Sequence, residues 1–188
     1  MHHDTMIDLP ASGMLALTRD ALASLRASLM RDVGDAAAGT LQEAGYAGGA
    51  ALYESFTRWL SSQGVGSPDS LSMESFQRHA AGFFRAAGWG TLNVSALHDT
   101  VAMLESSDWG EADTAGAMPQ PSCHLSAGMF ADFFGRVADA PLAVMEVECR
   151  STGAERCRFL LGSTEVMTQV YEEMARGAGY EAAVGAAA

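Results

Sequence analysis

Apolar residues in the first half of the chain recur at the spacing of a helix. Over residues 14–30 the leucines stand three, four and seven positions apart, which predicts an amphipathic helix with Ser12 placed to cap it. The pattern continues over 35–45 and 49–62, stops at the glycine- and proline-containing stretch 63–69, and resumes over 72–87. The leucines on the predicted face of the first helix are Leu15, Leu22, Leu25 and Leu29.

After residue 90 the period changes from about four to two. Residues 91–97 alternate apolar and small polar side chains, and 100–105 can return beside them after His98 and Asp99. Two further runs, 142–150 and 155–161, predict a β-hairpin around the glycine-containing stretch between them. The second half of the chain therefore supplies about four strands.

The segments around these strands complete the predicted fold. Residues 106–120 are rich in Ser, Asp, Gly and Pro and predict a loop, which the helical pattern of 121–134 follows. Ser163 begins a last predicted helix that runs through Met174. The order of elements predicts an α+β domain, with one small antiparallel sheet of about four strands packed with N-terminal, middle and C-terminal helices.

The length of 188 residues fits one domain with a core of its own. No internal repeat or long linker divides the chain. We expect a flexible N-terminus over 1–10, one domain over 11–176, and a frayed tail over 177–188.

Charge narrows the classes of partner. The net charge is -12, and all 11 basic side chains are arginines. Nucleic acids and anionic membranes need basic patches that such a surface hardly supplies. No stretch of eighteen apolar residues spans a bilayer, and no secretory signal precedes the domain, so we expect a cytoplasmic protein.

The chain has three cysteines, all within its last third: Cys123, Cys149 and Cys157. An odd number excludes a fully paired disulfide framework. The predicted hairpin places Cys149 and Cys157 on one face, and the helical segment can deliver Cys123, so a site for a soft metal in a reducing compartment is one interpretation. Buried structural cysteines are the other, since the C-x2-C spacing of common zinc modules is absent.

Two segments carry a family resemblance. PSCHLSAGMFADFF at 121–134 and VMEVECRSTGAERCRF at 144–159 resemble the 4-vinyl reductase domain family, and the similarity is best over 88–162. The family includes a protein linked to bacteriochlorophyll synthesis and the sensory domains of activators that respond to aromatic compounds, and it shares its fold with subunits of a vesicle-tethering complex. The resemblance implies a zinc ion held by Cys123, Glu146, Cys149 and Cys157.

Glu146 is the least secure of these ligands. Residues three apart in a flat strand face opposite ways, so Glu146 and Cys149 share a metal only if a bulge or twist turns the carboxylate. Glu148, Glu155 and His124 are the alternatives. Three nearby arginines either compensate the negative charge of the site or form a solvated face of the hairpin: Arg150, Arg156 and Arg158.

The small-molecule role of the family implies an apolar pocket between helices and sheet, with His98 as its polar tip. Core packing explains most of the same residues equally well. The tryptophan that phenol sensors carry shortly before an S-x-E-A stretch has no counterpart, which argues against phenol itself. The candidate ligand-binding residues are Trp109, Trp89, His98, Phe84, Met103, Phe130 and Phe134, with Phe83, Met129 and Phe133 beside them.

Catalytic motifs are absent from the sequence. We find no G-x-G-x-x-G, P-loop or H-E-x-x-H pattern, and the adjacent Cys123 and His124 do not face each other on a helix. The leading hypothesis is a zinc-stabilised, homodimeric domain that senses or carries a hydrophobic or aromatic ligand and works with a separate signalling or biosynthetic protein. The alternatives are an accessory role in bacteriochlorophyll or tetrapyrrole synthesis, and a protein-assembly module without a ligand.

Overall fold

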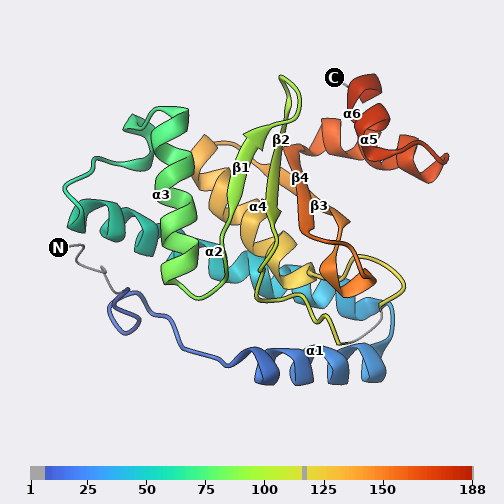
Figure 1. The fold of residues 1–188 in the computed structure, drawn as a ribbon, viewed down its shortest axis with the longest axis horizontal. Helices are drawn as coiled ribbons and strands as arrows, with labels where there is room; N and C mark the ends of the chain where they lie inside the picture. The colour runs from blue at the N-terminus through green and yellow to red at the C-terminus, as the bar shows by residue number, and fades with distance from the viewer. Residues whose placement is uncertain (1–6, 116–117, 188) are drawn as a thin grey trace.

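The computed structural model describes residues 7–115 and 118–187. Figure 1 shows a sheet with long helices behind it and two short helices at one end. The helices and strands are α1 Arg19–Val33, α2 Ala36–Ser62, η1 Pro68–Ser70, α3 Met73–Ala86, β1 Asn93–Ala96, β2 Val101–Ser106, α4 His124–Ala138, β3 Leu142–Glu148, η2 Arg150–Thr152, β4 Cys157–Ser163, α5 Thr164–Ala175 and α6 Tyr180–Ala187. The predicted α+β class and the four antiparallel strands are confirmed.

The sheet has the order β1-β2-β4-β3, and every neighbouring pair is antiparallel. Successive side chains therefore alternate between its two faces. On β4, Phe159 and Leu161 belong to one hydrophobic core, whereas Leu160 belongs to a second core on the opposite face. The aromatic face below means the side that α2, α3 and α4 cover, and the aliphatic face means the side under α5 and α6.

Helices α2 and α4 pack closely against each other behind the aromatic face (Figure 1). Glycines allow this contact, because a Cβ at Gly45 would lie 1.9 Å from the backbone oxygen of Leu125, and one at Gly128 would lie 1.9 Å from that of Gln42. Both helices turn aromatic rings into the core, where neighbouring rings meet edge-on or tilted. The fully buried members are Phe56, Phe83, Phe84, Trp109, Phe130, Phe133 and Phe159.

The aliphatic face is covered by α5 and by the end of the chain. Residues 180–187 form helix α6, whose Ala183 and Val184 are buried against Leu160 and Met167. The prediction of a frayed tail over 177–188 was therefore wrong for this helix. Small residues conceal such a helix in the sequence, because alanine and glycine give only a weak amphipathic pattern.

The N-terminal arm also differs from its prediction. Helix α1 begins at Arg19, with the Thr18 side chain accepting a hydrogen bond from Ala21 N–H, so residues 14–18 are not helical and Ser12 does not cap a helix. Leu15 is 95% exposed and Leu25 62% exposed, so the predicted leucine face is not buried. None of the described helices has the length and apolar character to cross a membrane.

Candidate metal centre

Three different elements bring the cysteines together. Cys123 lies at the N-cap of α4, Cys149 immediately follows β3, and Cys157 is the first residue of β4. All three side chains are completely buried, and none forms a disulfide. The junction between α4 and the β3–β4 hairpin is thus a pocket of thiols at one end of the aromatic face.

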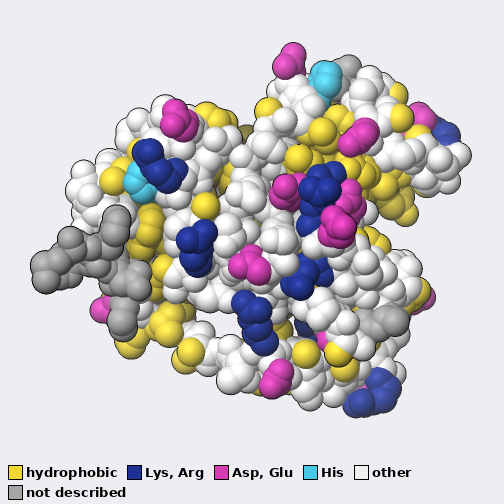
Figure 2. All heavy atoms as spheres, viewed as in Figure 1, with side chains coloured by type: hydrophobic (Ala, Val, Ile, Leu, Met, Phe, Trp, Pro, Cys, Tyr) yellow, Lys and Arg dark blue, Asp and Glu magenta, His cyan; other side chains and the backbone are white. Residues whose placement is uncertain are grey.

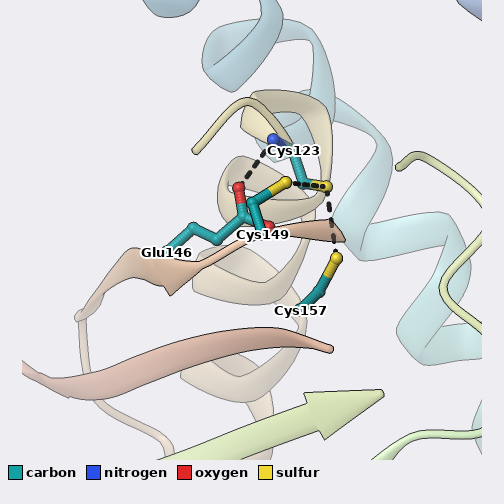
Figure 3. A group of neighbouring side chains, drawn as sticks. All are labelled: Cys123, Glu146, Cys149 and Cys157. Carbon is teal, nitrogen blue, oxygen red and sulfur yellow. Dashed lines mark hydrogen bonds between the residues drawn. The ribbon is translucent and has the colours of Figure 1, made fainter. Parts of the chain in front are cut away.

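A β-bulge settles where Glu146 points. Glu146 pairs with Phe159 and Glu148 with Arg158, so β3 has one more residue than β4 at this point. Val147 then packs on the aliphatic face, while Glu146 and Cys149 both lie toward α4 (Figure 3). The bulge that the sequence required for Glu146 and Cys149 to meet is present.

The four side chains are close enough to hold one metal ion. The Sγ atom of Cys123 lies 3.7 Å from that of Cys149 and 3.9 Å from that of Cys157 (Figure 3). One donor atom from each cysteine and from Glu146 lies within 4.8 Å of the others. The backbone N–H of Cys123 donates to Glu146 Oε2 at 2.8 Å, while the buried Oε1 has no hydrogen-bond partner among the described residues. A buried carboxylate oxygen without a donor fits a position beside a cation.

Proton affinities in the cluster agree with this arrangement. Burial, together with the nearby Cys149 thiolate, raises the pKa of Glu146 to about 8. The pKa of Cys149 is lowered because its sulfur accepts hydrogen bonds from Cys123 and Cys157. The pKa of Cys123 is raised by those same hydrogen bonds and by burial. Without a metal, the thiols and the carboxyl group must retain protons to avoid accumulating negative charge, and a cation removes that need.

The alternatives to Glu146 lie elsewhere. Glu148 accepts hydrogen bonds from Arg158 and from the Tyr180 hydroxyl, both at 2.9 Å, on the aliphatic face. Glu155 is exposed, and His124 lines an outer groove beside the cluster. None of the three belongs to the group of converging donor atoms.

The arginines of the hairpin do not compensate the cluster as a group. Arg156 and Arg158 form ion pairs with Glu105 and Glu148, and these charges gather over β2 and β4 in Figure 2. For this pair, the interpretation as a hairpin face is the better one. The backbone N–H of Arg150, by contrast, donates to Cys157 Sγ at 3.5 Å.

A buried ion pair beside the cluster was missed in the sequence. Arg26 and Glu111 approach to 3.3 Å with side chains only 5% and 0% exposed. Arg26 also donates to the backbone oxygen of Ser122, next to Cys123, at 2.6 Å. Glu111 accepts from the backbone N–H groups of Leu125 and Ser126, which begin α4. An arginine four residues after Leu22 and three before Leu29 was the available signal, since it stands on the predicted apolar face.

The proposed ligand-binding residues do not form one pocket. Trp109, Phe84 and Phe130 pack ring to ring inside the aromatic core, and Trp109 Nε1 donates to Ser126 Oγ at 2.7 Å. Trp89 is partly exposed and stacks on Trp109 with ring centres 5.6 Å apart. Met103 lies on the opposite face of the sheet, against the second core. These residues are core rather than a shared cavity wall.

Phe134 and His98 do line one cavity together. This groove has a volume of about 510 Å³ and lies between α3, the β1–β2 hairpin and the end of α4. In Figure 2 it lies at the notch between the lobe that carries α3 and the lobe that carries the β1–β2 turn. Its apolar walls come from Leu71, Phe76, Val94, Ala102, Phe134, Val137, Leu142 and Leu161.

Comparison with known proteins identifies the second half of the chain. Residues 108–163 match the family model of the 4-vinyl reductase domain. This matched segment contains all three cysteines and Glu146, so the family resemblance is confirmed where the candidate metal centre lies. No curated protein matches the sequence at a significant level.

Solved structures share the fold at low sequence identity. The phenol-responsive sensory domain of the transcription activator PoxR, solved with phenol, aligns with a TM-score of 0.65 and 19% identity over 86% of this chain and 82% of its own. A trafficking protein particle complex subunit 3 from Naegleria fowleri, covalently bound to palmitic acid, aligns with a TM-score of 0.57 and 16% identity over 77% of this chain and 91% of its own.

A vinyl-4-reductase family protein from Methanocaldococcus jannaschii aligns with a TM-score of 0.40 and 19% identity over 58% of this chain and 66% of its own. That score is too low to bear on the fold. The PoxR domain and the trafficking subunit show that the architecture extends well beyond the segment that the family model matches, into the N-terminal helices.

Proposed function

We propose that this chain is a small-molecule-binding domain that senses or carries a hydrophobic or aromatic ligand, with a zinc ion stabilising one end of the fold. The observation that carries the proposal is the apolar groove of about 510 Å³ at the end of the sheet. Ligand sites are commonly concave, apolar and of this size. The shared fold with the PoxR sensory domain, which was solved with phenol, supports the same assignment.

The spacing of the sulfurs supports zinc as the metal. Tetrahedral zinc with Zn–S bonds of about 2.3 Å requires its sulfurs to lie about 3.8 Å apart. The distances from the Cys123 Sγ to the other two sulfurs are 3.7 and 3.9 Å. Glu146 would be the fourth ligand, through the carboxylate whose Oε1 has no other partner among the described residues.

Four protein ligands leave no open position, so the zinc would have a structural role. It would fasten the start of α4 to the β3–β4 hairpin, and we propose no catalytic step there. The groove lies at the other end of α4, where Phe134, Val137 and Ala138 contribute to its wall. The metal centre would therefore support the fold without contacting the ligand.

A blocked groove tests the ligand proposal. A ligand that binds only the folded protein stabilises it by about 2.7 kcal/mol at a hundredfold excess over its Kd. We expect 2-phenylethanol and similar neutral aromatics to raise the unfolding midpoint of the wild type, and Ala102→Phe to abolish the rise by filling the groove. Ala143→Phe, on the aliphatic face, is the matched control and should keep it. If a broad panel gives no shift with the wild type, the ligand proposal is wrong.

An assembly module is the second candidate, and exposed apolar residues on the N-terminal arm favour it. Leu15, Leu17, Leu25 and Val33 are 95%, 58%, 62% and 47% exposed. A second copy of the chain would cover such residues in a homodimer. Light scattering should then give a dimer mass that falls to the monomer mass in the double variant Leu15→Ser, Leu25→Ser. A monomeric wild type would remove this candidate.

A further inference from the structure

The polar rim of the groove carries charge of one sign. Asp69 on η1 and Asp99 in the β1–β2 turn are the only charged carboxylate or guanidinium groups among the described lining residues. The other polar side chains there are His98, Thr100 and Ser163. Both aspartates are exposed, and neither forms an ion pair with an arginine in the described part of the chain.

No side chain in the groove can attach a ligand covalently through a thiol or an amine. The three cysteines are completely buried in the metal cluster, and the chain has no lysine. A thioester of the kind that an acylated cysteine requires has no acceptor at this site. Ligands in the groove must therefore bind reversibly, by apolar contact and by the polar groups of the rim.

The rim determines which head group such a ligand can carry. A carboxylate at the mouth would meet two aspartates and no arginine, in a molecule whose net charge is -12. A protonated amine would be attracted by the same groups and could donate hydrogen bonds to them. We infer that the groove selects an apolar molecule bearing a protonated amine over a carboxylate with the same hydrocarbon part. The inference rests on the proposed function of the groove.

Three probes with one hydrocarbon skeleton test the selection: 2-phenylethylamine, 2-phenylethanol and phenylacetate. Each places a ring in the groove and differs only in the charge of its head group. At low salt the amine should bind about 3- to 10-fold more tightly than phenylacetate, with the alcohol between them, because each exposed ion pair contributes little. The preference should shrink toward about onefold near 0.5 M salt, since screening weakens exposed pairs.

Charge-neutralising variants locate the effect. Asp69→Asn and Asp99→Asn, singly and together, should lower the affinity for the amine about two- to fivefold per site and leave the alcohol unchanged. Asp20→Asn on α1 changes the net charge equally but lies outside the groove lining, so it is the matched control and should leave the ratio of the amine and phenylacetate affinities unchanged.

The outcomes separate this inference from the proposed function. Equal affinity for amine and phenylacetate, with the alcohol still bound and lost in Ala102→Phe, overturns the charge selection but keeps the groove as a ligand site. An equal loss in Asp20→Asn and Asp99→Asn also overturns it, because the whole molecular field would then act rather than the rim. Failure of all three probes to bind refutes both.

Discussion

The two faces of the sheet differ in what holds their helices. On the aromatic face, seven completely buried aromatic side chains interlock between the sheet, α2, α3 and α4. On the aliphatic face, α5 and α6 rest on a smaller group of aliphatic side chains and on a polar contact, in which the Tyr180 hydroxyl bonds to Glu148 at 2.9 Å. The candidate metal centre and the groove both belong to the aromatic face. We infer that this face fixes the fold, and that α6 is the part of the molecule most readily released.

The largest expected effect is at the metal centre. Protein purified without added metal should contain about one zinc per chain, and Cys149→Ser should remove it, because a hydroxyl is a poor substitute for a thiolate. Elemental analysis and the unfolding midpoint measure the loss.

Variants of the neighbouring residues sharpen this test. Glu146→Gln should speed the loss of zinc to a chelator, while Glu148→Gln and His124→Ala should retain it, since only Glu146 converges on the sulfurs. Equal loss from all three would show that the fourth ligand is wrongly assigned. Metal-free wild type with three titratable thiols would remove the zinc site.

Core truncations compare the two faces directly. Phe130 is completely buried and contacts the rings of Phe84, Trp109 and Phe159, so Phe130→Ala should lower the free energy of unfolding by about 3–5 kcal/mol. Val184→Ala on α6 should cost only about 1–2 kcal/mol, because it removes two methyl groups. Urea unfolding of both variants provides the measurement. A larger cost for Val184→Ala would reverse the proposed ranking of the faces.

The ion pair between α1 and the start of α4 gives a pH-dependent test. Arg26→Met should cost about 3 kcal/mol at neutral pH, because it leaves the buried Glu111 carboxylate without its cation. Burial already raises the pKa of Glu111 in the fold, so the folded state binds a proton more tightly than the unfolded state. Stability then falls as pH rises from the unfolded to the folded pKa, and loss of Arg26 must widen that window.

The double variant Arg26→Met, Glu111→Gln is the control for this pair. It should recover part of the lost stability at neutral pH, because no buried charge remains. Urea titrations at about pH 5 and about pH 8 should show a gap between the single and double variants that grows with pH. A gap independent of pH would mean that Arg26 acts by packing alone.

The smallest effect should come from the polar contact of α6. Tyr180→Phe removes a hydroxyl that bonds to Glu148 and Arg158, and should cost about 0.5–1.5 kcal/mol. Hydrogen exchange should show faster opening of α6 with little change in α4. An equal acceleration in both helices would mean that the two faces unfold as one unit.

Periodicity was sufficient for the strands, because alternation leaves a plain record in the sequence. The same parity separates Met103 from Leu104 on β2, so the assignment of Met103 to a pocket with Phe130 could have been rejected in advance. The bulge at Val147 could only be stated as a condition, since a bulge depends on the pairing of two strands.

The N-terminal arm was predicted poorly because leucine spacing says nothing about which face of a helix finds a partner. Helix α1 is anchored by Arg26, its one fully buried residue, whereas Leu15 and Leu25 stay exposed. The groove could not be predicted either. It arises where η1, the β1–β2 turn and the end of α4 meet, and no local pattern records such a meeting.

The glycine contact between α2 and α4 makes the metal centre vulnerable to changes far from its chemistry. A methyl group at position 45 would overlap the backbone oxygen of Leu125, two residues after Cys123, so α4 would have to move by about 1 Å to restore an ordinary contact. Metal coordination tolerates little such displacement. Gly45→Ala should therefore behave in a genetic screen like the loss of a ligand, although it touches none of the four donor side chains, and an absent side chain acts as the gauge that sets where Cys123 stands.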